Sequence, residues 1–224
     1  MKKGVIIVAG GSGRRMESHI PKQYLDLAGK PLIVHTLEKF LSFDPDMEVV
    51  LVLATEHQKY WEEISKSHGY GSGIKIANSG TTRYGSVKNG LQFIKDGVIV
   101  GIHDAVRPLV SHGTLRRCYE EAEAKGSGIP VVEMDETVRM VQERSHSIHM
   151  DRSTLRRVQT PQVFKSELIR EAYDQTSKQD FTDDASVYES CYEEVSLVEG
   201  NRENIKITNP TDLQLASVLI RLVE

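Results

Sequence analysis

The alternation of short apolar runs with amphipathic, helix-like stretches constrains the fold of this chain most strongly. Apolar runs rich in β-branched residues occupy positions 5–8, 47–54, 74–77, 97–103 and 128–132. Stretches with helical spacing of apolar residues separate them, beginning near Pro31, Glu56, Thr82 and His112. This order predicts an α/β fold, a Rossmann-like and mostly parallel sheet flanked by helices, with ligands at the carboxyl ends of the strands.

The alternation stops near residue 134. Residues 137–142 and 147–150 are expected to form two strands joined by a polar turn, which predicts a protruding β-hairpin arm at about 134–152. Helical patterns return at 166–175, at 183–190 and from about Pro210. A chain of 224 residues suits one sizeable core. We therefore expect a single domain, residues 1–224, with an arm.

Composition narrows the class of protein. The formal net charge of −4 disfavours a nucleic-acid binder, which is usually basic. Cys118 and Cys191 lack metal-site or disulfide-framework spacing, which fits a reducing compartment. No apolar run approaches the ~20 residues that span a bilayer, and the apolar start at residues 5–8 is too short for a signal peptide. We expect a cytoplasmic protein with no nucleic-acid or membrane partner.

The first apolar run leads into a glycine loop followed by cations. Gly10, Gly11 and Gly13 permit a tight turn and close backbone approach to a ligand, and Arg14, Arg15 and Lys22 follow within nine residues. The loop lacks the GxxxxGK[ST] pattern, and Met16 stands where a dinucleotide fingerprint has its third glycine. A plain strand-to-helix turn would not need three cations, so the loop predicts a bound polyanion.

A second motif, IHDAVRP at 102–108, ends another buried run. Asp104 would stand at the carboxyl end of a strand as a partner for Mg²⁺ or a ribose, with Arg107 holding a phosphate; a local Asp–Arg ion pair explains the motif equally well. His103 is expected to be structural rather than a catalytic base.

Other motifs are weaker taken singly. Thr82, Arg83 and Ser86 open a predicted helix, where hydroxyls and free amides could hold a base or a ribose, but N-capping is the simpler interpretation. TDDAS at 182–186 is typical of a capped helix start. Arg152 lies in a charge cluster that could be a solvated face, and Lys206 alone says little.

Seven motifs in one order carry a resemblance: AGGSGRRM, PKQYL, HDAVRP, DETV, TPQVF, TDDAS and VEGNRENIKIT. Together they resemble the 2-C-methyl-D-erythritol 4-phosphate cytidylyltransferases of the non-mevalonate isoprenoid pathway. The resemblance implies transfer of CMP from CTP to a sugar-alcohol phosphate with release of pyrophosphate. It also implies Mg²⁺ as cofactor, with Asp104 as its metal residue, and a homodimer formed through the arm.

The resemblance assigns roles to residues. Arg15 and Lys22 would stabilise the transition state, and Arg152 and Lys206 would position the incoming acceptor. Arg107 and Thr137 would line the acceptor site, and Thr137 and Arg152 would complete the site of the partner subunit. Arg14 receives no role. The nucleotide would be held by Ala9, Gly10, Gly11, Ser12, Gly13, Gly80, Thr81, Ser86 and Asp104.

Three alternatives remain at this point. Ribitol-5-phosphate cytidylyltransferases share the glycine loop, PKQ and HDAVRP, so the acceptor could be ribitol 5-phosphate. A non-catalytic nucleotide-binding protein could keep the fold, although the combination of Arg15, Lys22, Asp104, Arg152 and Lys206 argues against lost activity. A dehydrogenase is the weakest alternative, because the third glycine and the acidic ribose partner are missing.

Overall fold

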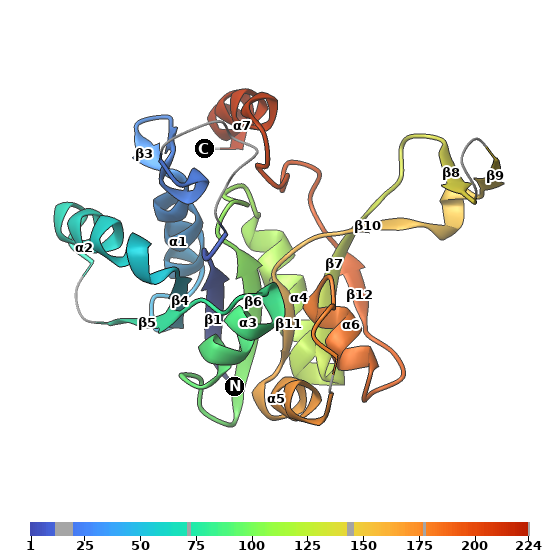
Figure 1. Cartoon of the computed structure of the whole chain (residues 1–224), viewed down its shortest axis with the longest axis horizontal. Helices are drawn as coiled ribbons and strands as arrows, with labels where there is room; N and C mark the ends of the chain where they lie inside the picture. Colours follow the sequence, from blue (N-terminus) through green and yellow to red (C-terminus); the bar gives the residue numbers. More distant parts are fainter. Residues whose placement is uncertain (12–19, 71–72, 143–145, 177, 224) are drawn as a thin grey trace.

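The protein is built around one mixed sheet, described here from a computed structural model (Figure 1). The structure describes residues 1–11, 20–70, 73–142, 146–176 and 178–223. Within them, eight strands form the sheet, seven of them in the order β10-β7-β11-β6-β1-β4-β5, with β12 paired to β7. These strands are β1 (Lys2–Val8), β4 (Glu48–Leu53), β5 (Ile74–Asn78), β6 (Val98–Asp104), β7 (Ser127–Glu133), β10 (Arg156–Val158), β11 (Gln162–Lys165) and β12 (Leu197–Glu199).

Helices cover both faces of this sheet, as the alternation predicts (Figure 1). Successive residues of β1 point to opposite faces, so Val5 and Ile7 join one core and Ile6 joins the other. The core with Val5 includes α1 (Leu32–Phe43), α2 (Gln58–Ser67) and α4 (His112–Lys125); the core with Ile6 includes α3 (Arg83–Leu91), α5 (Ser166–Gln175) and α6 (Asp184–Glu189). The predicted α/β class is confirmed.

The sheet departs from a simple parallel arrangement at β11. The parallel pairs are β6–β1, β1–β4, β4–β5 and β12–β7. β11 lies between β6 and β7 and runs antiparallel to both, and β10 runs antiparallel to β7. The sequence pattern missed β10, β11 and β12 because runs of three or four residues are too short to show a period.

A small third core holds the loop after β6 in place. Val106 and Leu109 from that loop pack with Leu32, and with Ile207 and Ile220 from the C-terminal region. The backbone N–H of Ile207 donates to the carbonyl of Val106 over 3.0 Å. The cluster includes residues of β2 (Asp26–Leu27) and α7 (Pro210–Val223); β2 pairs with β3 (Lys30–Pro31). This packing brings Lys206 to the end of β6.

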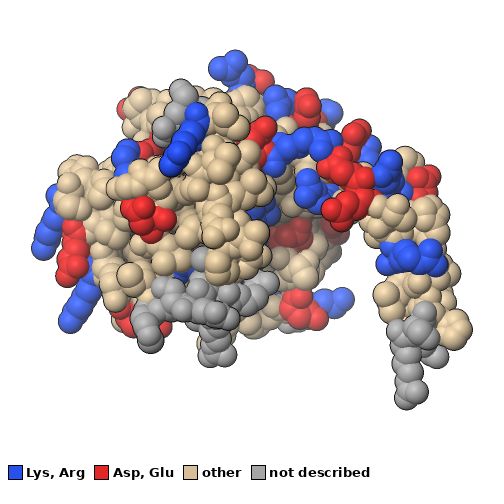
Figure 2. Space-filling view, turned by 90° about the horizontal axis from the view of Figure 1, so that it is seen from above, with Lys and Arg blue, Asp and Glu red and all other residues tan. Residues whose placement is uncertain are grey.

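The predicted hairpin stands away from the body of the chain (Figure 1). It consists of β8 (Val138–Val141) and β9 (Ser147–Met150), which pair antiparallel. Seen from above, acidic and basic side chains gather where the hairpin joins the body (Figure 2). Among the described residues, no helix is both long and apolar enough to cross a bilayer.

Candidate active site

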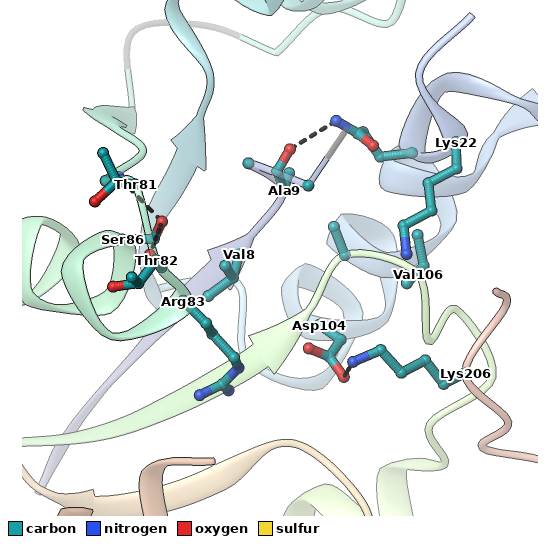
Figure 3. Close-up of a pocket in the computed structure, with 15 residues that line it drawn as sticks. Val8, Ala9, Lys22, Thr81, Thr82, Arg83, Ser86, Asp104, Val106 and Lys206 are labelled. Atoms are coloured by element: carbon teal, nitrogen blue, oxygen red, sulfur yellow. Dashed lines mark hydrogen bonds and ion pairs between the residues drawn. The ribbon is translucent and has the colours of Figure 1, made fainter. Parts of the chain in front are cut away.

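A pocket opens at the carboxyl ends of β1 and β6, where the fold class predicts a ligand site (Figure 3). Its volume of about 410 Å³ is in the range of small-molecule sites. The pocket brings together nine of the site residues predicted from the sequence. Its lining is Val8, Ala9, Gly10, Gly11, Lys22, Gln23, Gly80, Thr81, Thr82, Arg83, Ser86, Asp104, Ala105, Val106 and Lys206.

The first wall of this pocket is the backbone after β1. A Cβ added at Gly10 would lie 2.5 Å from Cβ of Ser79, so the close approach of these two loops requires glycine. The buried amide of Gln23 donates from Nε2 to the carbonyl of Ala9 over 2.6 Å. Lys22 precedes it in η2 (Lys22–Tyr24) and projects its side chain into the pocket (Figure 3). Gln23, the last residue of the PKQ motif, thus holds the loop after β1 in place, a role that the sequence analysis did not predict.

The second wall is the turn into α3. A Cβ at Gly80 would lie 2.7 Å from the carbonyl carbon of Gly85, so only glycine fits there. The hydroxyl of Ser86 accepts from the N–H of Gly80 over 3.0 Å and donates to the carbonyl of Thr82 over 2.9 Å. Thr82 caps α3 through the N–H of Gly85, as predicted. Ser86 therefore shapes the turn, and Gly80, Thr81 and Thr82 of this turn line the pocket.

Asp104 ends β6 at the floor of the pocket. Its Oδ2 lies 3.1 Å from Nζ of Lys206 and accepts from Nε of Arg107 over 3.2 Å. Burial alone would raise the pKa of this carboxyl, but the charges of Lys206, Arg83 and Arg107 outweigh it and hold the pKa below its usual value. Asp104 is therefore ionised, and the local Asp–Arg ion pair considered from the sequence does form.

A buried hydrogen-bond network holds the loop that carries Asp104. The hydroxyl of Thr160 accepts from the N–H of Asp104 over 3.1 Å and lies 3.0 Å from Nδ1 of His103. Nε2 of His103 lies 3.1 Å from the carbonyl of Arg107, which can only accept. Burial lowers the pKa of His103 to about 4, so the ring is neutral and Nε2 carries the proton. The structural role expected for His103 is confirmed.

The site provides one carboxylate suited to Mg²⁺. No cluster of three or more metal-ligating side chains occurs within the described part of the chain. None of the described residues donates a hydrogen bond to Oδ1 of Asp104, so this oxygen is available beside a pocket lined by cations. Mg²⁺ commonly binds through one or two carboxylates and otherwise through substrate phosphates and water. A single ionised carboxylate therefore fits Mg²⁺ delivered with a triphosphate.

A second hollow of about 140 Å³ adjoins the first on the other side of Asp104. It shares Arg83, Asp104 and Lys206 with the larger pocket and also contains Arg107. The sequence analysis proposed no site role for several of its residues, because the patterns around Thr82, Thr160 and Thr182 indicate a helix cap, a loop and a second helix cap. These are Arg83, Thr160, Gln162, Thr182 and Asp183.

Two expected acceptor residues lie away from both hollows in this chain. Thr137 is exposed beside the hairpin, and Arg152 lies in η4 (Arg152–Thr154), where Nη1 donates to the carbonyl of Asp135. Arg152 lines a separate surface hollow with Glu133 and Arg156. One chain alone therefore does not bring Thr137 and Arg152 to Asp104.

Some expected residues lie outside the described part of the chain. They are Ser12, Gly13, Arg14 and Arg15. The roles expected for them stay predictions.

Comparison with known proteins assigns the family. The family model of IspD, 2-C-methyl-D-erythritol 4-phosphate cytidylyltransferase, matches residues 4–222. The enzyme of that name from Bacteroides fragilis is 49% identical over 220 residues, which cover 98% of this chain and 100% of the relative. The enzyme of the same name from Phocaeicola vulgatus is 48% identical over 220 residues, with the same coverage.

Solved structures agree with these sequence matches. The 2-C-methyl-D-erythritol 4-phosphate cytidylyltransferase of Thermus thermophilus has a TM-score of 0.79 at 32% identity, covering 99% of this chain and 100% of that one. The 4-diphosphocytidyl-2C-methyl-D-erythritol synthase of Anaerococcus prevotii has a TM-score of 0.84 at 26% identity, covering 98% and 96%. The resemblance inferred from the motifs is confirmed, and the chain belongs to the 2-C-methyl-D-erythritol 4-phosphate cytidylyltransferase family.

Proposed function

We propose that this chain transfers CMP from CTP to 2-C-methyl-D-erythritol 4-phosphate in the non-mevalonate isoprenoid pathway. The observation that carries the proposal is the pair of adjoining hollows that share Asp104, Lys206 and Arg83. The larger one suits a nucleoside triphosphate and the smaller one a sugar-alcohol phosphate. Family membership over residues 4–222 supports the same donor and acceptor.

The chemistry is a phosphoryl-centred displacement. An oxygen of the acceptor phosphate forms a bond to the α-phosphorus of CTP, and the bond from that phosphorus to the α–β bridging oxygen breaks. The bridging oxygen leaves with pyrophosphate, and the product carries a new diphosphate link. The acceptor oxygen is ionised at neutral pH, so no general base is needed. The protein's task is to align the two phosphates and to neutralise their charge.

Cations of the pocket suit this task. The Lys22 side chain enters the triphosphate pocket, and we assign it, with Arg15, to the charge that develops on the α-phosphate (Figure 3). Lys206 and Arg107 flank the acceptor hollow and would hold the acceptor phosphate. Ala9, Gly10, Gly11, Gly80, Thr81 and Ser86 would enclose the nucleotide. Mg²⁺ held by Asp104 and the phosphates would supply positive charge to the triphosphate.

The arm supports a homodimer. Met140 and Ile148 lie directly opposite each other on one face of the hairpin, with 45% and 43% of their surfaces exposed. An isolated two-stranded hairpin is marginally stable in water, so a partner that covers this face would stabilise it. A second copy of the chain would at the same time receive Thr137 and Arg152 beside its acceptor hollow. We assign the reaction to the cytoplasm, in keeping with the free thiols of Cys118 and Cys191.

A pyrophosphate-release assay tests the donor and the acceptor together. CTP, UTP and ATP are each combined with methylerythritol phosphate or ribitol 5-phosphate. Turnover with CTP and methylerythritol phosphate, at least tenfold faster than any other combination, is expected. A preference for ribitol 5-phosphate would move the chain to the other acceptor, and no turnover with any pair would contradict an enzymatic role.

A further inference from the structure

Arg83 lies in the wall between the two hollows of the site. Its side chain lines the larger pocket with Lys22 and the smaller one with Thr182. The same residue opens α3 directly after the cap Thr82. Figure 3 shows the Arg83 guanidinium reaching past Val8 to the same side of the pocket as Asp104. Arg83 and Asp104 line both hollows together, so phosphates bound in the two hollows would have both side chains in their walls.

A buried carboxylate fixes the Arg83 side chain from behind. Nη1 of Arg83 donates to Oδ1 of Asp184 over 2.9 Å, and Nη2 donates to Oδ2 over 2.5 Å. The Asp184 side chain is fully buried. The hydroxyl of Tyr173 donates to Oδ1 of Asp184 over 2.7 Å. The carboxylate is thus held by two groups and presents both oxygens to one guanidinium.

The position of Asp184 is itself fixed by the sheet. Oε1 of Gln162, in β11, accepts from the N–H groups of Asp184 and Ala185, both over 2.8 Å. Nε2 of Gln162 donates to Oδ2 of Asp183 over 2.9 Å. One buried side chain of the sheet therefore anchors the first turn of α6. The chain of contacts runs from β11 through α6 to the guanidinium between the hollows.

A purely structural ion pair between α3 and α6 would explain the Arg83–Asp184 contact. It would not explain why part of the Arg83 side chain stays exposed in the site. The Arg83 side chain keeps 24% of its surface exposed, whereas Asp184 keeps none. None of the described residues accepts a hydrogen bond from Nε of Arg83. The exposed part lines both hollows, and its charge contributes to the low pKa of Asp104. The guanidinium is thus anchored along one edge and open along another.

We propose that Arg83 is a further catalytic residue of this site, which contacts the phosphates of donor and acceptor where they meet, and that Asp184 and Tyr173 are its positioning residues. An anchored guanidinium suits this place because its planar fork can bind one carboxylate and one phosphate at once. The anchoring keeps the two phosphates aligned without ordering a long side chain in each catalytic cycle. The inference rests on the proposed function, because it assumes that two phosphates react here.

Four variants and a control separate catalysis from folding. Arg83→Lys keeps the charge and loses the fork, and Arg83→Ala loses both. Asp184→Asn weakens the anchor at constant size, and Tyr173→Phe removes one hydrogen bond from it. Lys95→Ala is the matched control, because Lys95 is an exposed cation shortly after the same helix. Each variant is assayed for kcat and for both KM values, for CTP binding by calorimetry and for its unfolding midpoint.

The inference predicts a loss in kcat rather than in binding. Arg83→Lys should lower kcat about 100-fold, the scale of losing one preorganised hydrogen-bond donor, with the Kd for CTP within about threefold of the wild-type value. The kcat of Asp184→Asn should fall by a similar factor. The double variant Arg83→Lys/Asp184→Asn, assayed in the same way, should be no slower than the slower of its two single variants. Tyr173→Phe should lose roughly tenfold. Added guanidinium ion should raise the kcat of Arg83→Ala at least tenfold, and added ammonium ion should not.

Other outcomes overturn the inference. If wild type turns over and folded Arg83→Lys keeps kcat within threefold, the ion pair only joins α3 to α6. A rise in the Kd for CTP at unchanged kcat would make Arg83 a donor-binding residue alone. If Asp184→Asn fails to fold, Arg83→Lys and Tyr173→Phe still decide. Absence of wild-type turnover with CTP and methylerythritol phosphate would instead overturn the proposed function, and this inference with it.

Discussion

Nζ of Lys206 lies 3.1 Å from Oδ2 of Asp104, and this ion pair joins the segment before α7 to the end of β6. The two residues are 102 positions apart in the sequence, and the Ile207–Val106 hydrogen bond of 3.0 Å beside them holds the segments together. Lys206 neutralises this buried carboxylate and lines both hollows; with Mg²⁺ held by Asp104, as proposed above, the lysine would be released toward a phosphate. This relationship links the triphosphate hollow to the acceptor hollow.

Lys206→Ala should mainly impair use of the acceptor. We expect a rise of roughly tenfold or more in the KM for methylerythritol phosphate, because a charge-assisted contact to phosphate contributes about 1.5–3 kcal/mol. Steady-state kinetics with the acceptor varied will measure it, with Lys30→Ala as control, since Lys30 pairs with Glu38 outside the site. An unchanged acceptor KM, with weakened CTP binding instead, would refute the assignment.

Lys22→Ala should lower kcat by about 100-fold or more, because a charge partner of the transition state is lost. CTP affinity, measured by calorimetry, should change much less than kcat. The half-buried Lys30, eight positions further along the chain, again provides the control. Near-normal kcat in Lys22→Ala would remove this lysine from the mechanism.

Gly80→Ala should destabilise the turn into α3 by about 1–3 kcal/mol and weaken CTP binding, because the new methyl group would overlap the backbone of Gly85. Gly73→Ala is the matched control, since a Cβ there would meet no atom within 4 Å. Urea unfolding and CTP calorimetry will compare the two variants. Equal stability and equal CTP affinity in both would show that the close approach at Gly80 is unimportant.

Stability should fall below pH 6.5 because of His103. Its pKa is lowered by burial to about 4, so between pH 4 and 6.5 the unfolded chain binds a proton that the folded chain excludes. The contribution is therefore fully present above pH 6.5 and is lost as pH falls toward 4, roughly 2 kcal/mol between pH 7 and pH 5. Asp104 adds a loss only below about pH 3.8.

Urea unfolding of wild type and His103→Gln at pH 7 and pH 5 will measure this contribution. The free energy of unfolding of wild type should fall by roughly 2 kcal/mol more than that of the variant. Parallel pH dependences in the two proteins would mean that His103 is not the group responsible.

The arm variant Met140→Asp/Ile148→Asp should shift the protein from dimer to monomer in sedimentation at micromolar concentration. Two exposed apolar side chains that the proposed dimer would cover are replaced by charges that repel across one hairpin face. Phe93→Asp, on a body residue that is 40% exposed, should stay dimeric. A wild-type protein that sediments as a monomer would contradict the proposed role of the arm.

Most of the fold follows from local pattern, and part of the site does too. Buried β-branched runs predicted β1, β4, β5 and β6, and the rule that ligands bind at carboxyl strand ends correctly placed Asp104 beside Gly10. The antiparallel insertion of β11 between β6 and β7 was not predictable, because its pairing depends on residues far apart in sequence.

Arg83 shows why the rest of the site was missed. The sequence offered Thr82 as a helix cap, and the capping interpretation explained the whole motif. The functional signal lies in the contact with Asp184, 101 positions away, where TDDAS also looked like a simple cap. Arg83 and Asp184 each directly follow a helix cap, so the local pattern gives neither of them a further role. Their contact becomes visible only in the tertiary structure.

The most direct test of the proposed chemistry follows the oxygen atoms of the acceptor phosphate. The wild-type protein is incubated with CTP, Mg²⁺ and methylerythritol phosphate whose phosphate oxygens are ¹⁸O, and the products are weighed by mass spectrometry. We predict that all the label stays in the nucleotide-linked product, one atom of it in the new diphosphate bridge, and that pyrophosphate carries none. Label in pyrophosphate, or no nucleotide-linked product at all, would contradict attack by the acceptor phosphate on the α-phosphorus.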